Sequence, residues 1–209
     1  MTAPRLMLIS PELAAGTVLP LEAALGADSG IAAVILRTAP DTDERALLKT
    51  LKPLVEAAQA KDAAALIAGA PDVAGKAGAD GVHVFGDRQS REAVARFKPE
   101  KIVGTGGLRT RDAAMIAGEL GCDYVLFGDP GKGGETPPLE ATCERLSWWA
   151  EIFTTPCAGQ AETLDAIGPL ARTGAEFIAL SSFVWTHPDG PEAAMRAAEA
   201  ALKQAIVPA

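Results

Sequence analysis

Short apolar runs recur along the whole chain, each four to seven residues long and rich in Val, Ile, Leu or Phe. Runs that are continuously apolar, rather than alternating with polar residues, are typical of strands buried on both faces of a parallel sheet. The pattern therefore predicts eight strands, at 6–9, 32–36, 64–68, 81–85, 101–104, 124–127, 152–158 and 177–180. The run at 152–158 fits least well, because Pro156 has no N–H to donate to a neighbouring strand.

Helical segments and their connections to the strands follow a repeated pattern. Apolar residues at helical spacing lie over 47–58, 113–120 and 194–205. Three segments, which we call the helix-to-strand joints, share one order: a glycine, a small residue, an acid and the first residue of a strand. They are 78–81, 121–124 and 174–177. In each joint the glycine is expected to end a helix in the left-handed conformation.

Strands that alternate with helices can form an open, doubly wound sheet or a closed barrel. Eight strand signals together with a repeated joint favour the closed barrel. No linker or low-complexity segment divides the chain. We therefore predict a single (β/α)8 TIM barrel of the phosphate-binding type over residues 1–209.

Composition and charge exclude several classes of protein. The 209 residues are 48% hydrophobic and 22% charged, which is typical of a globular protein and not of a disordered one. The net charge of −8, without a dense Lys/Arg stripe, argues against a nucleic-acid partner. No apolar stretch is long enough for a membrane span, so no membrane association is expected. Three scattered cysteines and two histidines form no zinc motif, and they fit a reducing, cytoplasmic location.

Residues that follow the predicted strands are the candidates for function, because sites in such barrels lie at the carboxyl ends of the strands. Gly159, Ser181 and Ser182 follow the last two strands and could hold a phosphate, or they could form ordinary turns. Arg37 follows a buried strand and needs a partner, either a ligand anion or a structural carboxylate. Lys132 lies in a glycine-rich loop and could close over a phosphate or remain solvated.

His83 lies within the fourth predicted strand, between Val82 and Val84. Because side chains alternate along a strand, His83 should point into the barrel if the two valines face the helices. A buried, hydrogen-bonded histidine without a chemical role is the alternative interpretation.

The strand ends and joints resemble those of the thiamine-phosphate synthase and thiazole tautomerase superfamily of small barrels. The resemblance covers nearly the whole chain and is best at 36–37, 66–83, 120–125 and 174–182. The segment Gly-Ala-Asp-Gly-Val-His at 78–83 is its most telling part. The resemblance implies an enzyme of thiamine biosynthesis that joins an aminopyrimidine-methyl pyrophosphate to a thiazole phosphate and releases pyrophosphate. It also implies Mg²⁺ as the cofactor, a phosphorylated heterocycle as the partner and a possible homodimer.

The resemblance assigns roles to particular residues. Arg37 would balance negative charge and Lys132 would close on the leaving phosphate, as the catalytic pair. Substrate and phosphate contacts would come from Thr105, Gly106, Gly159, Gln160, Ser181, Ser182 and His83.

The sequence also departs from the family pattern. Ala68 and Gly69 stand where the family has Asn-Asp, and Asp87 lies about one place away from the second metal carboxylate. Ala39 stands where the second strand of the family ends in Lys, and Gln160-Ala161 where it has Gly-Gly. The tautomerases use a histidine near the end of the fifth strand, where this chain has Thr105 to Arg109.

Two further functions stay open beside that of the synthase. One is a catalytically silent barrel that binds a phosphorylated ligand, which the missing metal ligands favour. The other is an unrelated phosphate-binding barrel such as a sugar-acid aldolase. That enzyme would need a Schiff-base lysine inside a strand, and none of the eight runs has a lysine in its interior.

Overall fold

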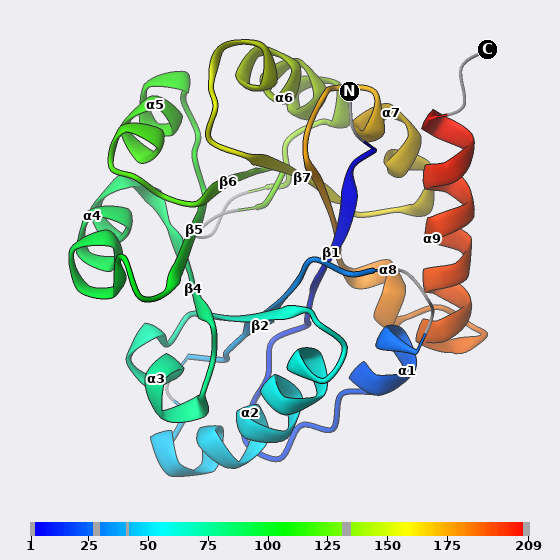
Figure 1. The fold of residues 1–209 in the computed structure, drawn as a ribbon. Coiled ribbons are helices and arrows are strands. Elements are labelled where there is room, and N and C mark those ends of the chain that lie inside the picture. The colour runs from blue at the N-terminus through cyan, green and yellow to red at the C-terminus, as the bar shows by residue number, and fades with distance from the viewer. Residues whose placement is uncertain (1–2, 27–29, 41, 131–134, 207–209) are drawn as a thin grey trace.

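The computed structural model describes residues 3–26, 30–40, 42–130 and 135–206. Within these residues, eight parallel strands pair in sequence order and close into a barrel, with β8 beside β1. Figure 1 looks along the axis of this barrel and shows the helices arranged as an outer layer around the strands. The predicted (β/α)8 barrel is confirmed.

The strands are β1 (Arg5–Ile9), β2 (Ala33–Arg37), β3 (Ala64–Ala68), β4 (Gly81–Phe85), β5 (Ile102–Gly106), β6 (Tyr124–Phe127), β7 (Cys157–Ala161) and β8 (Phe177–Leu180). The helices are α1 (Leu21–Leu25), α2 (Glu44–Gln59), α3 (Ala74–Ala77), α4 (Gly86–Phe97), α5 (Arg111–Glu119), α6 (Leu139–Ile152), α7 (Ile167–Ala171), α8 (Ser182–Trp185) and α9 (Gly190–Ile206). Two short 3₁₀ turns precede α3 and α7, namely η1 (Pro71–Val73) and η2 (Leu164–Ala166).

The prediction for the seventh strand is wrong at both of its ends. The structure starts β7 at Cys157 and ends it at Ala161, whereas the apolar run covers 152–158. Residue Ile152 belongs to α6, and the ring of Phe153 stacks on that of Trp149 with centroids 4.1 Å apart. The apolar residues before Pro156 therefore extend the packing of a helix and are not part of the sheet.

Side chains alternate along the strands between two apolar layers. One layer lies between the sheet and the helices and includes Leu36, Val82 and the fully buried Trp149. The other fills the inside of the barrel and includes Ile35 and Leu66. Because this alternation has a period of two, it decides which strand residues can reach a cavity inside the barrel.

The glycines of the three helix-to-strand joints adopt the predicted left-handed conformation. The φ angles are +77° at Gly78, +88° at Gly121 and +90° at Gly174. Side chains are disfavoured at such angles, so glycine lets the chain leave each helix and turn at once toward the barrel.

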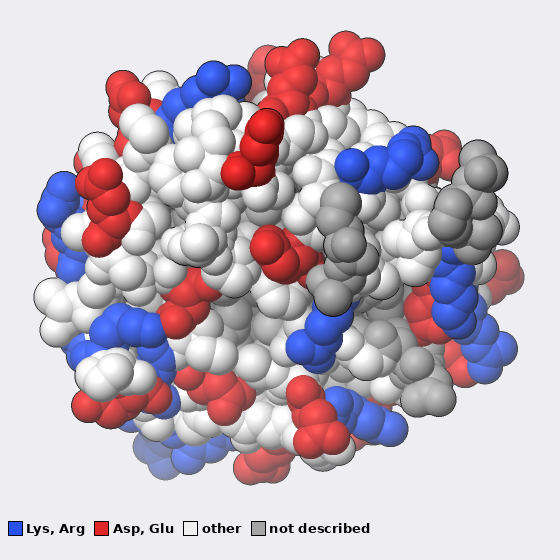
Figure 2. All heavy atoms as spheres, turned by 45° about the horizontal axis from the view of Figure 1, so that its top comes forward, with Lys and Arg blue, Asp and Glu red and all other residues white. Residues whose placement is uncertain are grey.

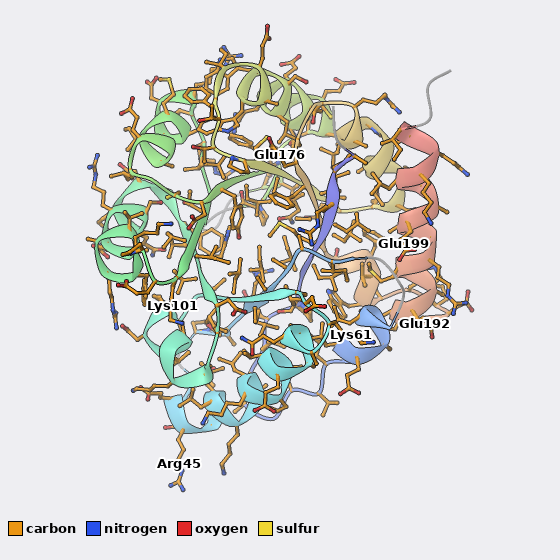
Figure 3. The ribbon with its side chains drawn as sticks, in the orientation of Figure 1. Arg45, Lys61, Lys101, Glu176, Glu192 and Glu199 are labelled. Atoms are coloured by element: carbon orange, nitrogen blue, oxygen red, sulfur yellow. The ribbon has the colours of Figure 1, made fainter. Side chains whose placement is uncertain are left out.

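The acids of the same joints accept hydrogen bonds from the backbone of the preceding strand. Asp80 accepts from the N–H of Ala65 in β3, and Asp123 from that of Val103 in β5, each at 2.8 Å. Glu176, labelled beside β7 in Figure 3, accepts from the N–H of Cys157, also at 2.8 Å. Each acid thus ties the start of an odd-numbered strand to the strand that follows it.

No helix in the described part of the chain is both long enough and apolar enough to cross a membrane.

Replacing Asp80 by alanine should lower the free energy of unfolding by about 1.5–3 kcal/mol, because the N–H of Ala65 loses a charged acceptor. Urea denaturation of the variant would measure this loss. As a control, Glu92→Ala removes an exposed ion pair with Arg88 and should change the unfolding free energy by only about 0–1 kcal/mol. Equal effects of the two substitutions would contradict the proposed role of the joint acids.

Candidate functional site

A cavity of about 840 Å³ opens at the carboxyl ends of the strands. This volume lies within the range of roughly 300–1,000 Å³ that is usual for small-molecule sites. Its lining includes five of the residues singled out in the sequence: Arg37, His83, Gln160, Ser181 and Ser182. Among the described residues, Thr105, Gly106, Gly159 and Asp87 are not part of the lining. Lys132 lies outside the described residues.

The alternation of side chains turns Thr105 and Gly159 away from the cavity. The hydroxyl of Thr105 is fully buried and accepts a hydrogen bond of 2.8 Å from the hydroxyl of Ser90 in α4. A Cβ atom at Gly159 would lie 2.7 Å from Leu146 and 2.9 Å from Leu170, so this position also faces the helices. The expectation that the Thr105 side chain lines the site is therefore corrected.

Gly106 faces the inside of the barrel, and its lack of a side chain leaves room for two polar groups. A Cβ atom there would lie 2.9 Å from Asp129 Oδ2 and 3.0 Å from His83 Nε2. The next residue, Gly107, donates its N–H to both carboxylate oxygens of Asp129, at 2.9 and 3.0 Å. This part of the backbone therefore holds an internal carboxylate at the cavity.

Arg37 ends β2 and has a carboxylate partner. Its Nη2 lies 3.1 Å from Glu12 Oε1, and both side chains are partly exposed at the cavity. Of the two partners that the sequence leaves open, the structure shows the protein's own carboxylate. The guanidinium still lines the cavity and can contact a bound anion from there.

His83 points into the barrel, as the alternation of its strand predicts. Its Nδ1 shares a hydrogen bond of 2.8 Å with the hydroxyl of Tyr124, while its Nε2 is buried without a hydrogen-bond partner among the described residues. Burial, together with the nearby charge of Arg37, lowers the pKa of His83 to about 3. The imidazole is therefore neutral at physiological pH, and its Nε2 is buried next to Gly106.

The cavity also contains functional groups that sequence reasoning missed. Glu162 directly follows β7, and it was overlooked because the seventh strand was expected to end three residues earlier. The indole of Trp185 lines the cavity and donates to the carbonyl of Ile9 at 2.7 Å. Glu12 lies in the loop after β1, where no candidate was sought.

Glu162 accepts hydrogen bonds from the polar side chains at the ends of β7 and β8. Its Oε2 accepts from Ser181 Oγ at 3.1 Å and from Ser182 Oγ at 3.3 Å. The side-chain amide of Gln160 donates to Glu162 Oε1. Three of the residues expected to contact a phosphate, Gln160, Ser181 and Ser182, are thus brought together, but around a carboxylate of the protein itself.

The described residues do not fit the Mg²⁺ ion that the resemblance implies. A Cβ atom at Gly69 would lie 2.6 Å from Thr38 Oγ1, so the space for a carboxylate at this position is closed. Asp87 is exposed at the start of α4, where it accepts the N–H of Arg88 at 2.9 Å. Within the described ranges, no group of three His, Cys, Asp or Glu side chains could hold a metal ion.

Fold and site together define a TIM-barrel protein with a cavity of small-molecule size at the carboxyl ends of its strands. A family profile described as "Thiamine monophosphate synthase" matches residues 6–184. Thiamine-phosphate synthase of Rhodospirillum centenum is 36% identical over 199 residues, which cover 93% of this chain and 96% of that protein. Thiamine-phosphate synthase of Erythrobacter litoralis is 33% identical, covering 87% and 88% of the two chains.

The solved structure of thiamine phosphate pyrophosphorylase from Pyrococcus furiosus has the same fold. It superimposes with a TM-score of 0.79 over 97% of each chain, at 20% sequence identity. The chain belongs to the thiamine monophosphate synthase family.

The depressed pKa of His83 predicts a loss of stability in acid. Between pH 6.5 and pH 3 the unfolded chain binds a proton at this residue that the folded chain does not bind, so the free energy of unfolding falls as the pH falls. This one group should lower the free energy of unfolding by about 2 kcal/mol between pH 7 and pH 5.

Urea denaturation of the wild type and His83→Gln at both pH values would measure this contribution. The variant should lose about 2 kcal/mol less than the wild type over this range. His187→Gln, which removes the other histidine and keeps His83, should follow the wild type. Equal pH dependence in wild type and His83→Gln would rule out a neutral, buried His83.

Proposed function

We propose that the chain is an enzyme of the thiamine-phosphate synthase type, which couples an aminopyrimidine-methyl pyrophosphate to a thiazole phosphate and releases pyrophosphate. The observation that carries the proposal is the cavity at the strand ends of a chain that belongs to this family. Its size suits two small heterocycles, and its lining offers an arginine and a neutral histidine.

The proposed reaction needs a cationic group that stabilises the negative charge of the departing pyrophosphate, and a pocket that excludes water. The bond between the methyl carbon of the pyrimidine and the pyrophosphate oxygen breaks, and the electron pair leaves with pyrophosphate. The lone pair of the thiazole nitrogen then forms the new C–N bond with the pyrimidine-methyl cation, and no proton is transferred. Arg37 is placed to stabilise the departing anion, and Ile9, Ile35 and Leu126 limit the access of water.

The neutral state of His83 suits this chemistry. A protonated imidazole inside the barrel would repel the cationic intermediate, whereas a neutral ring adds no positive charge. Asp129 lines the same cavity, and its carboxylate accepts the N–H of Gly107. No step is assigned to a metal ion, because the described residues do not fit one.

A second candidate function is a catalytically silent protein that binds a related ligand in the same cavity. The lack of space for a side chain at Gly69, where the family pattern has an aspartate, favours this second function. For either function we propose a cytoplasmic location and a small heterocyclic partner. Figure 2 shows acidic and basic side chains interspersed over the face that it draws, an arrangement that does not favour a nucleic-acid partner.

The two functions are separated by a coupling assay with the full chain. The aminopyrimidine-methyl pyrophosphate is mixed with the thiazole alcohol or the thiazole phosphate, with and without Mg²⁺. The synthase function predicts a coupled product and pyrophosphate in equal amounts with at least one acceptor. Binding of the heterocycles without product from either acceptor would refute the synthase function and support the silent binding protein.

Within this assay, Arg37→Gln should lower kcat/KM by about 100-fold or more, because the leaving pyrophosphate loses a charged donor. Arg88→Gln is the matched control, since Arg88 is exposed, pairs with Glu92 and does not line the cavity. The control should keep wild-type kcat/KM. A similar loss in both variants would show that Arg37 has no specific role in the reaction.

A further inference from the structure

The end of β4 places an aromatic ring on the inner side of the cavity. Phe85 is the last residue of this strand, and because it follows His83 by two positions it shares the inward-facing side of the strand. Its side chain is partly exposed and lines the cavity. Phe97, the other phenylalanine among the described lining residues, packs instead in the layer between the sheet and the helices. Phe85 therefore presents a phenyl ring to a ligand inside the barrel.

Contacts with neighbouring residues hold Phe85 in place. Its ring lies nearly perpendicular to the imidazole of His83, with centroids 5.1 Å apart and an angle of 81° between the planes. A Cβ atom at Gly107 would lie 3.5 Å from Phe85 Cβ and 3.7 Å from Cδ1, so the loop after β5 lies directly against this side chain. The N–H of Phe85 donates to Gln89 Oε1 at 3.1 Å, which ties the end of β4 to α4. The ring is thus positioned before a ligand binds, as electrostatic stabilisation of a transition state requires.

The registers of β2, β3 and β4 place Phe85 close to the level of Arg37. Arg37 is paired with Ala68, and Ala68 with His83, so these three inward-facing positions form one layer of the barrel. Phe85 lies in the next inward position of β4, toward the mouth. Ala68 and Gly69 line the cavity between the two strands and carry only a methyl group and a hydrogen. A small ligand can therefore lie with one end near a guanidinium and the other near a phenyl ring.

The proposed reaction creates opposite charges at the two ends of such a ligand. When the bond between the methyl carbon and the pyrophosphate oxygen breaks, negative charge develops on pyrophosphate and positive charge on the pyrimidine-methyl group. The face of an aromatic ring attracts a cation, an effect of about 2- to 30-fold in a binding constant. The ring has no lone pair, so it does not compete with the thiazole nitrogen for the cation. The neighbouring imidazole of His83 is neutral and does not oppose the positive charge.

We propose that Phe85 is a catalytic residue whose ring binds the aminopyrimidine and stabilises the cation that forms when pyrophosphate leaves. Arg37 then stabilises the departing anion, while the small residues at the end of β3 leave room for the bond that breaks between the two charges. The inference rests on the proposed function and identifies the group that receives the positive charge in that reaction.

Calorimetric titration of the full chain with two aminopyrimidines tests the attraction directly. One compound carries an aminomethyl group, which is a cation at pH 7, and the other carries a neutral hydroxymethyl group of similar size. Phe85→Leu keeps an apolar side chain but removes the aromatic face. The ratio of the two affinities, cation over neutral compound, should fall by about fivefold or more in this variant.

Phe97→Leu is the matched control, because it removes a phenyl ring from the helix-facing part of the same cavity lining. It should leave the affinity ratio at the wild-type value. Thermal unfolding of both variants verifies that they are folded.

Fluorinated phenylalanines at position 85 separate the electrostatics of the ring from its shape, and they also test the inference if Phe85→Leu does not fold. Each added fluorine weakens the attraction of the ring face for a cation and changes the size of the ring little. One, two and three fluorines should lower kcat and the affinity for the aminomethyl compound in steps, by about fivefold or more for the trifluorinated ring. The same series at position 97 should leave both quantities unchanged.

Three results would overturn the inference: an affinity ratio that is the same in Phe85→Leu as in the wild type, equal effects of the substitutions at 85 and 97, or binding of neither aminopyrimidine. The titrations do not depend on turnover, so the inference and the proposed function can fail separately. Stepwise loss of affinity for the cation without any coupled product refutes the synthase function alone. Coupling with a kcat that does not respond to fluorination at position 85 refutes the role of Phe85 alone.

Discussion

Three carboxylates at the starts of strands fix the register on which the site depends. Asp80, Asp123 and Glu176 each accept the backbone N–H of an odd-numbered strand and lie directly before the next strand. In a parallel barrel, a slip of one residue would exchange every inward side chain for an outward one. His83 would then face the helices and Thr105 the cavity. The joints at one end of the barrel thus determine the chemistry at the other end.

Much of the fold could be predicted from the sequence because strands buried on both faces leave a strong apolar signal. Four predicted strands, 64–68, 81–85, 124–127 and 177–180, have the observed bounds. The seventh failed because Ile152 and Phe153 are apolar for another reason, as the end of a helix and as a partner of Trp149. Local hydrophobicity does not tell which neighbour buries a side chain.

The site was less predictable, because a position near the end of a strand does not reveal the direction of its side chain. Arg37, His83 and Ser181 lie at the cavity, whereas Thr105 lies equally close to a strand end and faces α4. His83 was placed correctly because its valine neighbours indicated the phase of the strand. Glu162 was missed because an error of three residues at the end of β7 moved the search away from it.

The electrostatics of the cavity follow from these placements. Burial keeps His83 neutral, while Gly107 donates its N–H to Asp129 and the serines after β8 donate their hydroxyls to Glu162. A pocket lined by carboxylates and by a neutral histidine favours a positively charged species over a negatively charged one. This balance agrees with a reaction that passes through a cation and ends in a thiazolium product.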